Sequence, residues 1–285
     1  MSRIHQAMRR AEKEGRRDLS LQNLEHGSYL AGENNIIPSL GFTGPAFVHA
    51  HPNEKNETAL NEEKSGYSEL SISPSANVVA LSSPESCHTQ HFRMLGAKLC
   101  QMRTGCQLKT VLMTSPAAAE GKTLTVVNLA LVMARENNHK VLLIDANLRN
   151  SSLHCVLGVG REKGLSELVK EGLRGNEIIY STNVSNFHVV KAGKVHENPT
   201  EIINTQRMRD FLVLAAKRFD WVFLDSPSIL DYPDAELMSS LVDGVLLVVN
   251  ASQTSADLLV EGVQTLKGKN VLGIILNRQH ESHGV

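Results

Sequence analysis

From about residue 77 onward, short continuous apolar runs alternate with longer stretches that have helical spacing. Continuous β-branched runs predict buried strands, and apolar residues at i, i+3, i+4 and i+7 predict amphipathic helices. Strands separated by helices are typical of α/β proteins with a doubly wound, mostly parallel sheet covered on both faces. The predicted strands are VVAL, TVLMTS, KVLLIDA, FHVV, WVFLDS, GVLLVV and VLGIIL, and the predicted helices span about residues 86–102, 123–136, 205–217 and 256–267.

Two regions precede this domain and lack its pattern. Residues 1–17 show a short helical period and carry six lysine and arginine residues against two glutamates. This basic amphipathic helix either docks on a partner or an anionic surface, or folds against its own domain. Residues 18–75 are rich in Asn, Ser, Gly, Pro and Glu, and we predict a flexible linker of low order. The predicted domain then spans residues 76–285.

Charge and composition limit the classes of function. The 29 lysine and arginine residues nearly balance the 30 acidic residues, so the chain lacks the basic field that binding to nucleic acid requires. No apolar run reaches the roughly 18 residues of a membrane span, and the first residues lack the apolar core of a secretory signal. The four cysteines have neither metal-site nor redox spacing. We therefore expect a cytoplasmic protein.

The candidate chemistry begins where the strand TVLMTS leads into the helix near Thr123. The segment PAAAEGKT departs from the G-x-x-x-x-G-K-[ST] phosphate loop at its first position, where Pro116 stands, but it keeps Gly121-Lys122-Thr123. Backbone N–H groups and the helix dipole favour a phosphate at such a helix start. We predict that Lys122 reaches the β- and γ-phosphates of a nucleotide and that the Thr123 hydroxyl holds Mg²⁺. Taken alone, the tripeptide also fits an ordinary turn with a surface lysine.

Two further predicted strands end on an acidic residue. Asp145 follows KVLLI, with Asn147 and Arg149 just beyond it, and Asp225 follows WVFL. Ligands of open parallel sheets sit outside the carboxyl ends of the strands, where such acids can meet a phosphate-bound metal ion. A single aspartate after a strand is commonly a helix cap, but three chemically matched strand ends favour one site.

These segments together closely resemble the bacterial tyrosine kinases (BY-kinases) of capsule and exopolysaccharide loci. The resemblance implies a modified P-loop fold, with ATP and Mg²⁺ as cofactors, that transfers the γ-phosphoryl group to protein tyrosine. It also implies a membrane-bound polysaccharide co-polymerase or chain-length regulator as a partner, which would recruit the protein to the inner face of the membrane. The resemblance covers about residues 83–278 and includes TSPAAAEGKTLTVVNLA, LLIDANLR, KAGKVHENPTEIINTQRMRDFL, FDWVFLDSPSILDYPDA, VDGVLLVV and VLGIILNR.

The resemblance also implies roles for single residues. Lys122 and Thr123 match the Walker A positions, Asp145 the first acid of the second Walker motif, and Asp225 the Walker B acid. Lys122, Asp145 and Asp225 would be catalytic, and Thr123, Asp145 and Asp225 would hold Mg²⁺. Asn277, for which a strand-end turn is the alternative, and Arg278 would lie near the adenine. The implied nucleotide-binding positions are Ala119, Glu120, Gly121, Lys122, Thr123, Leu124, Asn277 and Arg278.

Two departures from the family pattern fall inside this site. Asn147 stands where the family has a second aspartate, and an amide can neither carry negative charge nor accept a proton from tyrosine. We expect this change to reduce turnover more than nucleotide binding. Ala119 stands where the family has glycine, and a Cβ there costs about 1 kcal/mol if the position requires positive φ.

Two other departures concern assembly and the phosphate acceptor. The family motif E-x-x-R-x-x-R, which packs subunits into a ring, reads Gln90, Arg93 and Gly96 here, so we expect weak self-association at most. The sequence ends NRQHESHGV without a tyrosine cluster, which leaves Tyr29 and Tyr67 in the linker as candidate acceptors.

Three functions fit these observations. The first is an active tyrosine kinase, and the second is a catalytically weakened, ATP-binding regulatory subunit of a polysaccharide co-polymerase. The third is a partitioning-type positioning ATPase, which usually has an early lysine in its phosphate loop that residues 116–121 lack.

Overall fold

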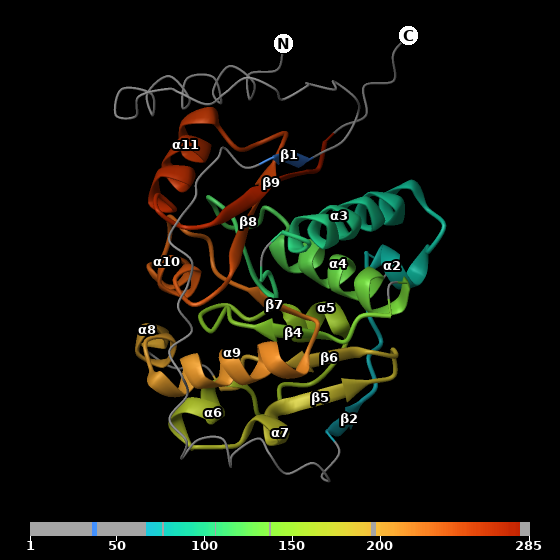
Figure 1. Cartoon of the computed structure of the whole chain (residues 1–285), viewed down its shortest axis with the longest axis vertical. Coiled ribbons are helices and arrows are strands. Elements are labelled where there is room, and N and C mark those ends of the chain that lie inside the picture. Colours follow the sequence, from blue (N-terminus) through green and yellow to red (C-terminus); the bar gives the residue numbers. More distant parts are fainter. Residues whose placement is uncertain are drawn as a thin grey trace.

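The computed structural model describes residues 36–38, 67–75, 77–105, 107–136, 138–194 and 198–279. These residues form a nine-stranded sheet in the order β1-β9-β8-β3-β7-β4-β6-β5-β2, which runs from top to bottom in Figure 1. Its paired strands are parallel except at β1–β9 and β5–β6. The strands are β1 (Ile36–Pro38), β2 (Ser68–Leu70), β3 (Thr110–Thr114), β4 (Val141–Asp145), β5 (Ile179–Thr182), β6 (Phe187–Val190), β7 (Trp221–Asp225), β8 (Gly244–Asn250) and β9 (Val271–Asn277).

Helices cover both faces of the sheet, and each face has its own apolar cluster (Figure 1). The central strands supply both clusters with a period of two: Val111 and Met113 of β3 face one side, and Leu112 faces the other. This confirms the predicted doubly wound, mostly parallel fold. One face carries α2 (Val79–Ser82), α3 (Cys87–Arg103), α4 (Lys122–Glu136) and α5 (Leu153–Leu157); the other carries α6 (Leu165–Lys170), α7 (Gly175–Ile178), α8 (Pro199–Ile203), α9 (Gln206–Arg218), α10 (Asp234–Ser239) and α11 (Ala256–Thr265).

Hydroxyl side chains cap three of the predicted helices. Ser86, Thr205 and Ser255 each accept a hydrogen bond from the backbone N–H three residues later, at the first turns of α3, α9 and α11. Such caps satisfy donors that a helix start otherwise leaves without partners. The starts of these helices therefore lie within one or two residues of the predicted positions.

The prediction that VVAL forms a strand is wrong, because Val79–Ser82 form the short helix α2. Side chains of α4 add two hydrogen bonds to this helix: Asn128 Oδ1 accepts from the Ala80 N–H at 2.9 Å, and Arg135 donates to the Ala80 carbonyl at 2.7 Å. Four apolar residues with buried members at Val78 and Ala80 fit either element, so contacts with α4, and with the Thr89 hydroxyl of α3 that donates to the Val79 carbonyl at 3.1 Å, decide between them.

The boundary expected after residue 75 lies earlier in the structure. Ser68–Leu70 form β2, which pairs in parallel with β5 at one edge of the sheet. Ile72 is 5% exposed, and its backbone N–H donates to Asn183 Oδ1 at 3.0 Å. Residues 67–75 thus belong to the folded domain rather than to the linker.

The predicted helix over residues 1–17 and most of the predicted linker lie outside the described residues. Within residues 18–66 the structure describes only Ile36–Pro38, which form β1 and pair with β9 in antiparallel orientation. Among the helices of the described ranges, none combines the length and apolarity that crossing a membrane requires.

Candidate active site

The loop between β3 and α4 holds the predicted phosphate-binding lysine. Lys122 is 8% exposed and its Nζ donates to Ser115 Oγ at 2.9 Å, so its side chain folds back over the loop. Ser115 Oγ in turn donates to the Ala117 carbonyl at 2.5 Å. Burial lowers the pKa of the Lys122 ammonium, and the nearby Asp225 carboxylate acts in the opposite direction. The lysine therefore lies inside the loop rather than on the surface.

Two residues of this loop have left-handed backbone conformations. Ala119 has φ of +61° and Gly121 has φ of +91°. The condition for a Cβ cost at Ala119 is therefore met, because a non-glycine residue is strained in this region. At Gly121 a Cβ would lie 2.2 Å from Asn277 Nδ2, so this position needs glycine for both backbone and space.

Side chains predicted to bind nucleotide also fasten the loop to β8 and β9. The Glu120 carboxylate is buried and accepts from the Asn250 N–H at 3.0 Å and from the Thr254 hydroxyl at 2.9 Å. Asn277 Nδ2 donates to the Glu120 carbonyl at 2.9 Å. The Glu120 side chain is therefore occupied, which leaves only its backbone for a ligand. The Asn277 side chain holds the loop in place through the Glu120 carbonyl.

Leu124 and Arg278 contribute to the site in different ways. Leu124 packs against the apolar cluster beneath α4, and its carbonyl accepts from Asn128 at 2.9 Å. Only its backbone N–H, at the start of α4, is available to a phosphate. Arg278 follows β9 with φ of +56°, and its carbonyl accepts from the Ser252 hydroxyl at 2.8 Å, while the residue itself is exposed.

The two predicted acids are buried side by side. Asp145 and Asp225 end neighbouring parallel strands, are direct partners in the β4–β7 register, and are 1% and 0% exposed. Burial, and then the charge of Asp145, raise the pKa of Asp225 to about 7. Burial likewise raises the pKa of Asp145 to about 6. Thr123 Oγ1 donates to Asp225 Oδ2 at 2.6 Å, so the start of α4 meets this pair.

This arrangement fits a divalent cation that also binds phosphate. Asp225 Oδ1 is buried and has no hydrogen-bond partner among the described residues, and a cation would satisfy it. The described residues contain no group of three or more His, Cys, Asp or Glu side chains able to hold a metal ion by themselves. A metal ion here would need oxygens from a phosphate and from water, which is the way proteins commonly bind Mg²⁺.

Asn147 lies just beyond Asp145 and shapes the following turn. Its Oδ1 accepts from the Asn150 N–H at 3.1 Å, and its own N–H donates to Asp145 Oδ1 at 3.2 Å. Ser151 donates to Asp145 Oδ2 at 2.6 Å, so both carboxylate oxygens of Asp145 are hydrogen-bonded. Ser115, Ser151 and Ser152, whose hydroxyl lies 3.1 Å from Thr123 Oγ1, were missed from sequence. The only available signal was a hydroxyl residue in a loop next to a predicted site residue.

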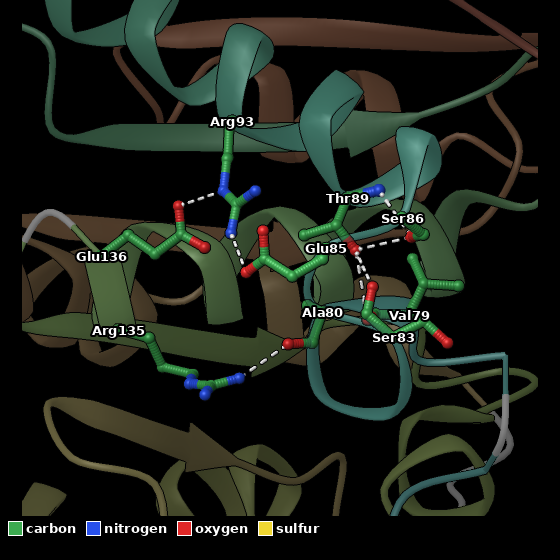
Figure 2. A network of polar contacts seen from close by, with 9 residues as sticks. All are labelled: Val79, Ala80, Ser83, Glu85, Ser86, Thr89, Arg93, Arg135 and Glu136. Atoms are coloured by element: carbon green, nitrogen blue, oxygen red, sulfur yellow. Dashed lines mark hydrogen bonds and ion pairs between the residues drawn. The ribbon is translucent and has the colours of Figure 1, made fainter.

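The positions aligned with the ring motif have other partners within this chain. Figure 2 shows Arg93 of α3 between two acids: its Nε lies 2.6 Å from Glu136 of α4, and an Nη lies 3.6 Å from Glu85. A Cβ at Gly96 would lie 3.2 Å from Met133 Cγ, so this position faces α4. Arg93, the one charged residue that remains of the ring motif, therefore forms its ion pairs within its own chain.

Comparison with known proteins places the chain in a family. A family model described as an AAA domain matches residues 109–273, more than half of the chain. Tyrosine-protein kinase YwqD of Bacillus subtilis is 29% identical over 215 residues, which are 73% of this chain and 90% of YwqD. Tyrosine-protein kinase CpsD of Streptococcus pneumoniae serotype 4 is 34% identical over 181 residues, 61% of this chain and 78% of CpsD.

A solved structure agrees with these relatives. The kinase domain of Escherichia coli tyrosine kinase ETK matches with a TM-score of 0.67 and 26% identity, and the match covers 78% of this chain and 94% of that domain. The shared fold, the P-loop with its buried acid pair and the sequence matches all lead to the same assignment. The chain therefore belongs to the bacterial tyrosine-protein kinase (BY-kinase) family.

Proposed function

We propose that this protein is an ATP-dependent tyrosine kinase that takes part in the control of exopolysaccharide or capsule biosynthesis. The observation that carries the proposal is the buried pair Asp145 and Asp225, which meets the Thr123 hydroxyl at the start of α4. Two carboxyls with raised pKa values are destabilising unless a cation compensates them, and such pairs are typical of functional sites. Magnesium triphosphate would supply a cation for the acid pair and an anion for the start of α4.

The residues divide the work of holding the nucleotide. Backbone N–H groups from Ala119 to Leu124 would bind the phosphates at the helix start, and the Lys122 ammonium would supply positive charge for the β- and γ-phosphates. Thr123, Asp145 and Asp225 would hold Mg²⁺, and the metal ion would supply positive charge beside the phosphates. Because phosphoryl transfer depends mainly on positioning and electrostatics, this set would orient the γ-phosphoryl group and stabilise its charge during transfer.

The second candidate function is an ATP-binding regulatory subunit with weak catalysis. Two observations favour it: Asn147 uses its side-chain oxygen for the following turn, and Ala119 strains the phosphate loop. Both changes leave the buried acid pair in place. This candidate therefore predicts nucleotide binding with little transfer to tyrosine.

The proposed partner is a membrane-bound polysaccharide co-polymerase or chain-length regulator, which would recruit the kinase to the inner face of the membrane. Family membership supports this proposal. Copurification of the tagged full chain with the co-polymerase encoded nearest to it, with and without residues 1–17, tests both the partner and the role of the basic N-terminus. If neither the full chain nor the chain without residues 1–17 copurifies with the co-polymerase, the proposed partner is contradicted.

One experiment separates the two functions. The full chain is incubated with γ-labelled ATP and Mg²⁺, with a glutamate–tyrosine copolymer as acceptor, and nucleotide binding is measured in parallel. Lys122→Met serves as the inactive variant, and Lys109→Met serves as the matched control, because Lys109 precedes β3 at the opposite end of the strand. Label on tyrosine that only Lys122→Met abolishes supports the kinase. Binding without label supports the regulatory subunit, and no binding contradicts both.

A further inference from the structure

The described tyrosines occupy very different places relative to the acid pair. The sequence has four tyrosines, and Tyr29 lies outside the described residues. Tyr180 is 8% exposed, and its hydroxyl donates to the Lys163 carbonyl at 3.1 Å. Tyr232 is 42% exposed and lies in the loop between β7, which ends at Asp225, and α10. A phosphoryl acceptor needs an accessible hydroxyl, which Tyr180 does not have.

Tyr67 is packed at the edge of the sheet, several strands away from the acid pair. Its ring packs against Phe219, at a centroid distance of 6.4 Å, and against His188, at 5.3 Å. Lys140, whose Nζ lies 5.9 Å from the same ring, directly precedes β4. Tyr67 precedes β2, which lies three strands from β4 in the sheet order, so at about 4.8 Å per strand spacing roughly 14 Å of sheet separates Tyr67 from Asp145.

The Tyr232 ring is held against the loop that follows Asp145. The Arg149 guanidinium lies over this ring, 4.4 Å from its centroid. Arg149 is fixed by the buried Asp234, with Nε–Oδ2 at 2.6 Å and Nη2–Oδ1 at 3.1 Å. Thr200 joins the cluster, because its hydroxyl accepts from Arg149 at 3.2 Å and donates to Asp234 at 2.8 Å. An exposed tyrosine is thus positioned by a cation at the edge of the sheet that carries the acid pair.

The loop that carries Tyr232 is also tied to the phosphate loop. The Ile229 N–H donates to the Ser115 carbonyl at 2.8 Å, and Ser115 is the residue that receives the Lys122 ammonium. Asp231 lies near enough to Lys122 that its charge raises the pKa of that ammonium, against the effect of burial. Tyr232 is the next residue after Asp231, so its backbone lies near the proposed nucleotide site while its ring lies against Arg149.

We propose that Tyr232 is the main tyrosine that this protein phosphorylates on itself, and that Arg149 pairs with the phosphate formed there. The proposal rests on the proposed kinase function. The Tyr232 phenol oxygen bonds to the γ-phosphorus of ATP, the bond from that phosphorus to the β–γ bridging oxygen breaks, ADP leaves, and the phenol proton passes to water. Phosphotyrosine carries a charge of about −1.5 to −2 at neutral pH, and guanidinium groups pair strongly with it.

Arg149 has a donor group available for this role. Its Nε and Nη2 bond to Asp234 and Thr200, whereas Nη1 has no partner within the described residues. A phosphate on the Tyr232 ring can therefore bond to Nη1 while Nε and Nη2 keep their hydrogen bonds to the buried Asp234 carboxylate. Phosphorylation would then add a second ion pair between the loop after β4 and the segment after β7, which Arg149 and Asp234 already join.

A panel of single substitutions tests the acceptor. Tyr29→Phe, Tyr67→Phe, Tyr180→Phe and Tyr232→Phe are each incubated with γ-labelled ATP and Mg²⁺, and the label is mapped by mass spectrometry. Phosphorylation of the glutamate–tyrosine copolymer is measured for each variant. We expect Tyr232→Phe to lose at least about four-fifths of the label on the protein itself and to label the copolymer like the unsubstituted chain.

The other outcomes overturn the proposal in distinguishable ways. Label that remains in Tyr232→Phe and maps to Tyr29 or Tyr67 overturns the acceptor and leaves the kinase function standing. Label on the copolymer but none on the protein does the same. No label on either, in folded protein, overturns the kinase function and the acceptor together.

A second measurement tests the role of Arg149 without relying on kinase activity. Phosphotyrosine is incorporated at position 232 during translation, and its phosphorus NMR signal is titrated in folded and in urea-denatured protein. We expect the second pKa of the phosphate, ordinarily about 6, to be lower in the folded protein, because the Arg149 charge favours the dianion. An equal or higher pKa in the folded protein, where Asp231 and Asp234 also lie nearby, would overturn the pairing.

Discussion

Asp145 and Asp225 are direct neighbours across the β4–β7 register, and both are almost completely buried. Each aspartate is the last residue of a five-residue strand whose other members are apolar. Two carboxyls in this position repel each other and are poorly solvated, so the protein maintains them at a cost in stability. A function that requires them is the simplest account of that cost.

The first prediction concerns pH and the Asp225→Asn variant. Because burial raises the pKa values of Asp145 and Asp225 to about 6 and about 7, the folded, metal-free protein binds more protons than the unfolded chain between about pH 4 and pH 7. Its free energy of unfolding therefore falls as the pH rises through this range. The free energy of unfolding of Asp225→Asn should exceed that of the unsubstituted protein by about 1–2 kcal/mol near pH 8, and the two should differ little near pH 4.

Urea unfolding in EDTA at both pH values measures this effect. Asp243→Asn is the matched control, because Asp243 Oδ2 accepts from the Lys109 N–H, the Thr110 N–H and the Thr110 hydroxyl at 2.8–2.9 Å. The same substitution there should destabilise the protein by about 1–2 kcal/mol. If Asp225→Asn is less stable than the unsubstituted protein near pH 8, the buried acid pair does not destabilise the folded protein.

The second prediction concerns the strained residue of the phosphate loop. Ala119→Gly removes the Cβ that strains the backbone at φ of +61°. Ala118 has no positive φ, so Ala118→Gly relieves no strain and only destabilises the folded protein by raising the entropy of the unfolded chain. We expect Ala119→Gly to be at least about 1 kcal/mol more stable than Ala118→Gly and to bind nucleotide more tightly than the unsubstituted chain. Thermal unfolding and nucleotide titration measure both quantities, and equal effects of the two substitutions would refute the strain.

The third prediction concerns the contact between the loop and the end of β9. Gly121→Ala places a Cβ against Asn277 Nδ2 and requires a φ of +91°, so the loop must move. We expect a loss of about 1–3 kcal/mol in stability and at least a tenfold loss in nucleotide affinity. Gly105→Ala is the control, because a Cβ there meets nothing within 4 Å. Unchanged affinity in Gly121→Ala would mean that the loop does not bind the phosphates.

The fourth prediction concerns the amide that replaces the second acid. Asn147→Asp keeps an oxygen that can accept from the Asn150 N–H and adds a negative charge near the site. If that group acts as a base, the rate of transfer to tyrosine should rise by about 10²-fold, with little change in nucleotide affinity. Steady-state transfer to the copolymer measures the rate. No increase, in a variant that still binds nucleotide, would mean that Asn147 does not stand at the position of the missing acid.

Much of the fold follows from patterns along the chain, and the exceptions have physical reasons. Strands β3, β4, β7 and β8 are continuous apolar runs, so both their type and their burial could be predicted. Strand β2 is only three residues long and includes Glu69, so nothing local marks it as part of the sheet. VVAL was mistaken for a strand because its helix depends on Asn128 and Arg135, about 50 residues away.

The candidate site shows the same division. The phosphate loop and both acids lie at strand ends, where a parallel sheet brings them together, so the proximity of Lys122, Asp145 and Asp225 could be predicted from the sequence. The structural duties of Glu120 and Asn277 could not be predicted, because they depend on contacts between β8, β9 and the loop. Likewise, Tyr67 was expected in the linker, but it packs against Phe219.

The central claim is that this edge of the sheet binds magnesium triphosphate, and calorimetry tests it most directly. ATP and ADP are titrated into the full chain with Mg²⁺ and with EDTA, and into the Lys122→Met and Lys109→Met variants, after circular dichroism confirms that each is folded. We predict saturable heat that requires Mg²⁺, that is lost in Lys122→Met and that persists in Lys109→Met. Absence of heat with both nucleotides in folded protein, or heat that is unchanged in Lys122→Met, would contradict the account.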